Sequence, residues 1–183
     1  MRKQALSPII YVLIIIWIVA AINLVTHDML NQFGIVPRRT SHLTGIIFSP
    51  FLHGGWGHLV NNTLAFACLG FLCSLTFKQP RSELIKLMIF VGVVGGLLTW
   101  SFARPGMHIG LSGIIFGLWG YVTVNGFLRR NIKYIAISLI AIVFYGGMFF
   151  GLLPTGGRIS FEGHLFGAIS GVLYCYLIRK RSS

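Results

Sequence analysis

Two residues with catalytic chemistry stand at the starts of two separate apolar segments. Ser112 lies in the glycine-rich stretch 110–120, and His164 lies in a similar stretch, 163–171. A serine hydroxyl is too weak an acid to be a nucleophile at neutral pH unless a neighbouring base takes its proton, and histidine is the commonest such base. The pair therefore predicts acyl-transfer chemistry, provided that the two segments lie against each other.

Glycines at helical spacing indicate that the two apolar segments lie against each other. Glycine recurs at positions 110, 113, 117 and 120 of the first stretch and at positions 163, 167 and 171 of the second. A stripe of small residues lets two helix backbones approach closely inside a membrane. We therefore predict contact between the helices that begin at these two stretches.

Further residues are placed to support the pair. His58 and Asn62 are four residues apart, so both side chains leave one helical face and would supply hydrogen-bond donors for a developing oxyanion. The backbone N–H of Ser112 at a helix start is a further donor. Phe116 follows Ser112 by four residues and is expected to stack on the imidazole of His164.

The acidic residues favour a Ser-His dyad over a triad with a carboxylate. The sequence has only three acidic residues, Asp28, Glu83 and Glu162. Glu162 is two positions from His164 and so points to a different side of a helix. A dyad of Ser112 and His164 is the simpler interpretation.

The composition is that of an integral membrane protein. Among 183 residues, 55% are hydrophobic and 10% are charged, and the mean hydropathy is +0.82, whereas about a quarter of the residues of a soluble domain are charged. The net charge of +12 comes from short basic clusters between apolar runs, which argues against a nucleic-acid partner. The three cysteines lie within apolar runs and form no disulfide or metal pattern.

The apolar runs predict an all-α polytopic membrane protein, with one domain over residues 1–183. A membrane-spanning helix needs about 20 residues, and six segments meet this length. We expect the first to be retained as a span and not cleaved as a signal peptide. The predicted spans are approximately 8–26, 56–77, 84–103, 111–128, 133–152 and 160–178.

The basic residues predict the orientation. With six spans both termini share a side, and most of the 15 Lys and Arg residues fall there. The positive-inside rule then places both termini in the cytoplasm, and the expected membrane is the inner membrane of a bacterium. The four basic residues on the other side are Arg38, Arg39, Arg104 and Arg158.

This orientation brings the polar residues together. Spans two, four and six all enter from the outer face, and their first turns hold His58 with Asn62, Ser112, and His164 respectively. Polar groups inside a membrane usually face a partner or a water-filled cavity. A shared depth predicts one site that opens to the outer face. The apolar connection 27–55 is expected to be partly embedded or to lie in the interface.

A metal-binding or metal-transport protein is an alternative from another class. All six histidines fall on the outer side or in the outer third, and imidazole is a common zinc and copper ligand. Carboxylates are nearly absent there, and no metalloprotease spacing occurs. The histidines are His27, His42, His53, His58, His108 and His164.

The sequence resembles the rhomboid intramembrane serine proteases, in their six-helix form. Three motifs in order on alternate spans carry the resemblance: His58-x-x-x-Asn62, Gly110-Leu111-Ser112-Gly113, and Gly163-His164 with Gly167. The stretch from Phe51 to Leu59 strengthens it, and nearly the whole chain is covered.

The resemblance implies an intramembrane serine endopeptidase that needs no cofactor and no metal. Ser112 would be the nucleophile and His164 the base, with an oxyanion hole from Asn62, His58 and the backbone at Ser112 and Leu111. The substrates would be transmembrane proteins in the lipid bilayer. They would enter beside span five and the segment Met148 to Gly157. A non-catalytic rhomboid-like protein is the remaining alternative, and substrate identity and oligomeric state stay open.

Overall fold

The computed structural model describes residues 2–154 and 159–179, and within these ranges the chain folds into a helical bundle. The only β-type pairing in that part of the chain is one antiparallel bridge between Ile35 and His108. The long helices are α1 (Arg2–Val25), α3 (Trp56–Ser74), α4 (Pro80–Phe102), α5 (Ser112–Arg129), α6 (Ile132–Tyr145) and α7 (Phe161–Arg179). Shorter helical turns are η1 (Met29–Phe33), η2 (Thr40–His42), α2 (Gly45–Phe48), η3 (Ser49–Phe51) and η4 (Gly146–Leu152).

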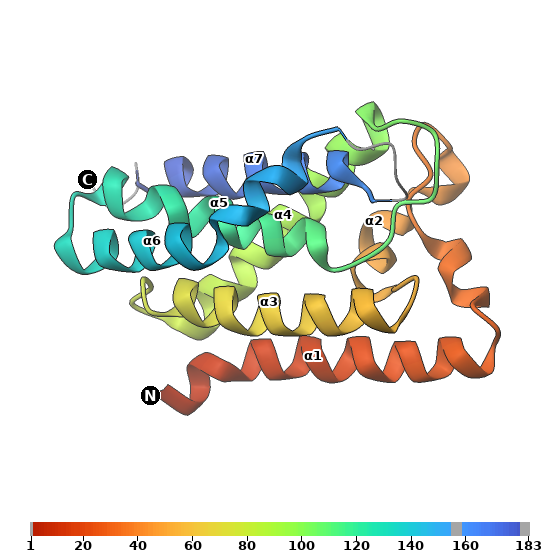
Figure 1. Ribbon diagram of the computed structural model, residues 1–183, viewed down its shortest axis with the longest axis horizontal. Helices are drawn as coiled ribbons and strands as arrows, with labels where there is room; N and C mark the ends of the chain where they lie inside the picture. Colours follow the sequence, from red (N-terminus) through yellow and green to blue (C-terminus); the bar gives the residue numbers. More distant parts are fainter. Residues whose placement is uncertain (1, 155–158, 180–183) are drawn as a thin grey trace.

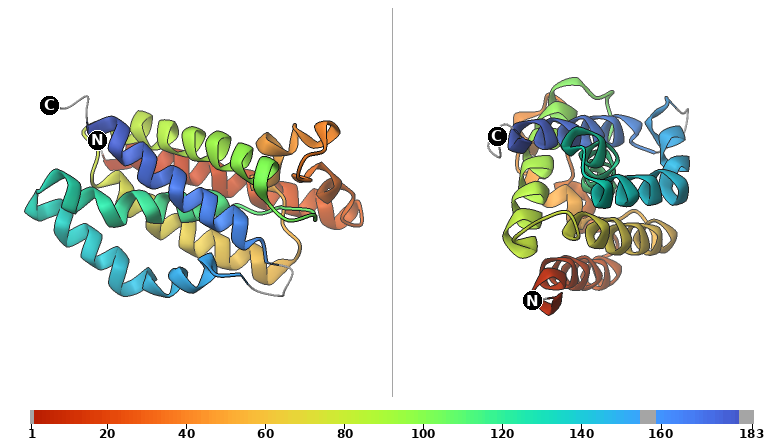
Figure 2. Two further views of the ribbon diagram at one scale, coloured as in Figure 1. Left: turned by 90° about the horizontal axis from the view of Figure 1, so that it is seen from above. Right: turned by 90° about the vertical axis from the view of Figure 1, so that its left-hand side faces the viewer.

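The long helices run side by side along the molecule, with α5 in the middle (Figures 1 and 2). α5 contacts α3, α4, α6 and α7, and α1 packs on the outside against α3 and α4. The start of α1 and the end of α7 lie at one end of the bundle, while the starts of α3, α5 and α7 lie at the other. The three helices that carry the predicted site residues therefore present their first turns to the same end.

Each predicted span corresponds to one of these helical segments. Four segments of the described chain are long and apolar enough to cross a membrane. They are Leu6–Val25, Pro80–Phe102, Ile132–Leu152 and Phe161–Arg179, of which the third joins α6 to η4. The fold is therefore all-helical, with four candidate spans by length and composition.

Helices α3 and α5 are not among these four candidate spans, because polar residues and glycines lower their mean hydropathy. Glycines, Ser112 and Asn125 lower the hydropathy of α5, and Asn61 and Asn62 lower that of α3. Asn125 is fully buried and Asn62 is 6% exposed. Other helices enclose α5, which therefore exposes little surface to lipid and need not be uniformly apolar. α3 buries Asn62 on its inner face but leaves Asn61 exposed.

The predicted contact between the two glycine-rich helices is confirmed. α5 and α7 form the most extensive helix pair of the bundle. A Cβ on Gly167 would overlap the carbonyl oxygen of Gly113, and one on Gly171 would overlap that of Gly117. The two backbones touch along this stripe, as small residues allow. The stripe fixes the position of the first turn of α7 relative to that of α5.

The connection between α1 and α3 is a chain of short helical turns over one end of the bundle (Figure 1). The bridge from Ile35 to His108 and a hydrogen bond from the Arg38 N–H to the Trp100 carbonyl (2.9 Å) hold it in place. Ile47 and Phe48 expose 65% and 48% of their surface. That exposure fits an interfacial position, and the embedding of this segment stays a prediction.

Candidate active site

Ser112 is the first residue of α5, and a glycine sets its position. Gly110 has φ +119, a conformation that residues with a side chain rarely adopt. Its N–H donates to the Ser49 carbonyl at 2.9 Å, which fastens the approach to the helix. The first N–H groups of an α-helix have no partner inside the helix, so the start of α5 offers free donors beside the serine.

His164 lies in the first turn of α7, and a serine cap defines where that helix begins. The hydroxyl oxygen of Ser160 accepts a hydrogen bond from the Gly163 N–H at 3.2 Å, the usual geometry of an N-cap. His108 Nδ1 lies 2.6 Å from the same hydroxyl. The loop before α5 thus contacts the cap of the helix that carries His164.

The structure brings Ser112 and His164 into hydrogen-bond contact. His164 Nε2 lies 3.0 Å from Ser112 Oγ, and His164 Nδ1 lies 3.0 Å from the carbonyl oxygen of Gly151 in η4. A carbonyl oxygen can only accept, so Nδ1 carries the proton of the neutral ring and Nε2 is free to accept from the serine hydroxyl. The geometry is that of a nucleophile and a base whose ring is oriented by a third group.

Phe116 lies against the imidazole, as its spacing from Ser112 predicts. The two rings are stacked, with centroids 4.1 Å apart and planes 7° apart. Phe116 is buried. Ring stacking and the Gly151 carbonyl together hold the His164 side chain in one orientation.

His58 and Asn62 face the same space from α3. A Cβ on Gly110 would lie 2.6 Å from His58 Cε1 and 3.6 Å from Asn62 Nδ2, so the backbone just before Ser112 lies directly on these side chains. Both line a cavity of about 680 Å³ that Ser112, Phe116 and His164 also line. Leu111 is fully buried, and only its backbone was expected to take part.

Sequence reasoning missed a third histidine, His53. Asn62 Nδ2 donates to His53 Nε2 at 3.0 Å, and the His53 and His58 rings are 5.1 Å apart. Burial, together with nearby His58, lowers the pKa of His53 to about 4, so its ring is neutral at neutral pH and can accept. His53 precedes the His58-x-x-x-Asn62 motif in a loop, where helical spacing gives no signal of its contacts.

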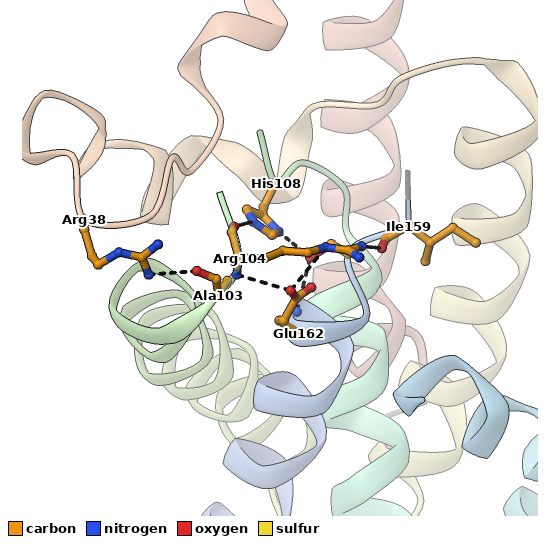
Figure 3. Close-up of polar contacts among 8 residues, drawn as sticks. Arg38, Ala103, Arg104, His108, Ile159 and Glu162 are labelled. Atoms are coloured by element: carbon orange, nitrogen blue, oxygen red, sulfur yellow. Dashed lines mark hydrogen bonds and ion pairs between the residues drawn. The ribbon is translucent and has the colours of Figure 1, made fainter. Parts of the chain in front are cut away.

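Glu162 joins the loop before α5 to the first turn of α7 (Figure 3). Its Oε1 lies 3.2 Å from both the Nε and the backbone N–H of Arg104, and the Arg104 guanidinium also donates to the Ile159 carbonyl at 2.6 Å. His108 Nε2 lies 3.1 Å from the Arg104 carbonyl. Glu162 therefore contacts Arg104 and not His164, and the ion pair ties the loop that leads to Ser112 to the helix that carries His164.

Replacing Glu162 with glutamine is expected to lower the free energy of unfolding by about 1–3 kcal/mol, because the buried carboxylate loses its charge-assisted hydrogen bonds to the more exposed Arg104. The side chain of Glu162 is only 8% exposed. Thermal unfolding of the detergent-solubilised protein would measure the loss.

The pair of Glu83 and Lys86 provides the matched control. These side chains are 27% and 62% exposed, and their atoms are 2.9 Å apart. Glu83→Gln makes the same chemical change, and we expect it to cost less than about 1 kcal/mol, as exposed pairs do. Equal shifts in the two variants would contradict a structural role for the pair of Arg104 and Glu162.

The remaining sequence-based expectations concern metal binding and substrate entry. The described residues contain no group of three or more His, Cys, Asp or Glu side chains that would hold a metal ion. Of the expected entry segment, Met148 lines the cavity and Gly151 contacts His164. Residues 155–157 of that segment, and Arg158 of the charge pattern, lie outside the described residues.

Comparison with known proteins finds matches over most of the chain. The model of the Rhomboid domain matches residues 40–181. An uncharacterized protein of Mycobacterium leprae is 38% identical over 174 residues, which cover 90% of this chain and 67% of that protein. An uncharacterized protein of Mycobacterium tuberculosis is 36% identical over 90% of this chain and 71% of its own length. RHOMBOID-like protein 4 of Arabidopsis thaliana is 29% identical over 72% of this chain and 33% of that protein.

Proposed function

Because the chain belongs to the rhomboid family of integral membrane proteins, we propose that it is an intramembrane serine endopeptidase with Ser112 as nucleophile and His164 as general base. One observation carries the proposal. His164 Nε2 lies 3.0 Å from Ser112 Oγ although the residues are on different helices, and the imidazole is oriented by the Gly151 carbonyl. A serine used only for packing needs no oriented base.

The chemistry follows from this geometry. His164 Nε2 takes the proton of the Ser112 hydroxyl as Oγ attacks the carbonyl carbon of the scissile peptide bond. The imidazolium then gives this proton to the leaving amine, which breaks the C–N bond and leaves an acyl group on Ser112. A water molecule, with His164 again as base, hydrolyses the ester and restores the serine.

The charge on the carbonyl oxygen needs donors in the transition state. Asn62 and His58 line the cavity beside Ser112, and the start of α5 supplies backbone N–H groups at Ser112 and Leu111. In soluble serine proteases, loss of one such donor costs roughly 10²–10³ in kcat. We propose that these four residues form the oxyanion hole, with His53 holding the Asn62 amide in place.

We also propose the topology and the substrates. One six-span domain would place both termini in the cytoplasm of a bacterium and open the site to the outer face of the inner membrane. The first turns of α5 and α7, which carry Ser112 and His164, lie at the end of the bundle away from the start of α1 and the end of α7 (Figure 1). The substrates would be transmembrane proteins that enter beside α6 and η4.

Covalent labelling tests the nucleophile without knowledge of the substrate. The detergent-solubilised protein is treated with a fluorophosphonate probe, and the adduct is located by mass spectrometry. We expect one adduct, at Ser112, because only an activated serine reacts at a useful rate. Heat-unfolded protein serves as the control and should not react. Absence of labelling in protein with a normal unfolding transition would contradict the proposal and favour a non-catalytic rhomboid-like protein.

A further inference from the structure

A second cavity lies at the opposite end of the bundle from the candidate active site. Its volume is about 830 Å³, and it is bounded by the connection from α3 to α4, by α4 as far as Val94, and by the ends of α5 and α7. Ser112 and His164 do not line it. The inference drawn from it is therefore independent of the proposed protease activity.

One wall of this cavity is apolar and faces outward. Ile89 and Val93 are one turn apart on α4 and expose 61% and 44% of their surface, and Leu177 on α7 exposes 47%. Both helices are long and apolar enough to cross a membrane. Exposed apolar side chains on such helices face hydrocarbon chains, so the cavity is open to lipid along this wall and forms an apolar groove.

The other end of the cavity is basic. Lys78, Lys86 and Arg129 line it, and Glu83 is the single acidic residue among its lining residues. Glu83 is already paired with Lys86. Neither Lys78 nor Arg129 forms an ion pair with a residue of the described chain. A surplus of positive charge thus remains at the bottom of an apolar groove.

Arg129 is the best-defined binding group in this cluster. It is the last residue of α5, and its Nε is buried with no hydrogen-bond partner among the described residues. A buried donor without a partner is destabilising, so a ligand atom that accepts from it is favoured. Lys78 and Arg129 also line an adjoining cavity with Arg130 and Arg179, so the positive charge extends around this end of the bundle.

We propose that this cavity binds an anionic phospholipid. The phosphate group contacts Arg129 and Lys78, and an acyl chain lies along Ile89, Val93 and Leu177. Arginine matches the geometry of a phosphate with parallel N–H donors. Lys78 lies just before α4 and Arg129 is the last residue of α5, and basic residues next to the ends of apolar helices attract anionic headgroups. The apolar wall selects a lipid over a free phosphate ion.

Native mass spectrometry of the delipidated, detergent-solubilised full chain tests the proposal. We expect phosphatidylglycerol to bind at least ten-fold more tightly than phosphatidylcholine with the same acyl chains. Inorganic phosphate should not compete at concentrations where the lipid saturates. Equal binding of the two lipids, or displacement by inorganic phosphate, would overturn the proposed anionic-lipid site.

Matched variants locate the site. Lys78→Gln with Arg129→Gln should weaken phosphatidylglycerol binding by ten-fold or more. Arg81→Gln with Lys133→Gln removes the same charge outside the cavity and should change binding by less than two-fold. If the first double variant does not fold, Lys78→Glu at an exposed position gives a second test, with an expected loss of at least three-fold. Equal losses in the two double variants would show only a general charge effect and would overturn the site.

Discussion

Replacing Ser112 with alanine is expected to lower the rate of transmembrane-substrate cleavage by roughly 10³-fold or more, and replacing His164 with alanine should have an effect of the same size. The Ser112 Oγ and His164 Nε2 atoms are 3.0 Å apart. The hydroxyl is not a nucleophile without the base, and the base has no proton to accept without the hydroxyl. The double variant should therefore be no slower than either single variant. The measurement is cleavage of a single-span reporter protein in proteoliposomes.

Two comparisons make this result specific. Ser82→Ala changes a serine whose hydroxyl donates a hydrogen bond to the Gln79 carbonyl at the far end of the bundle. This variant should cleave the reporter at the wild-type rate. The unfolding temperatures of all variants should stay close to that of the wild type. If the losses of the two single variants multiplied in the double variant, Ser112 and His164 would act independently, and the dyad would be refuted.

Replacing Gly171 with alanine is expected to destabilise the protein by about 3 kcal/mol, the upper part of the range for overpacking. The added Cβ would overlap the carbonyl oxygen of Gly117, which is helix backbone and cannot rotate away. The helices would have to separate, and this would also move His164 relative to Ser112. The unfolding temperature and the rate of fluorophosphonate labelling of Ser112 would both fall.

Gly92→Ala is the matched control, because it makes the same change inside another membrane helix. A Cβ on Gly92 would meet only Ile114 Cδ1, at 3.7 Å, which is an ordinary contact. The substitution should leave stability unchanged or raise it by up to about 1 kcal/mol, since alanine favours a helix. Similar unfolding temperatures for the two variants would contradict the tight contact between α5 and α7.

The sequence predicts those parts of the structure that depend on helical periodicity. Glycine spacing places α5 against α7, and the four-residue steps from His58 to Asn62 and from Ser112 to Phe116 predict which side chains share a face. Hydropathy predicts the long helices. It is weaker for α3 and α5, because glycine and asparagine that face other helices, such as Asn62 and Asn125, lower the hydropathy of the segment.

Contacts that involve loops or backbone could not be predicted in this way. His53 reaches Asn62 from an irregular segment, and Arg104 meets Glu162 from a loop 58 residues away in sequence. Neither pairing has a periodic signature. The contact between His164 and the Gly151 carbonyl cannot be predicted from side-chain types, because every residue has a carbonyl group.

This last contact has a consequence for genetics. In a triad, the orienting group is a carboxylate that a single codon change removes, whereas here it is part of the main chain. Scanning mutagenesis substitutes side chains and retains the carbonyl at every position. At residue 151 itself a new Cβ would lie 2.7 Å from Phe116 Cζ, so a variant there disturbs the stacked rings before it disturbs the hydrogen bond. Removing the contact needs chemical synthesis, an insertion or a deletion, and natural point mutations leave the orienting carbonyl in place.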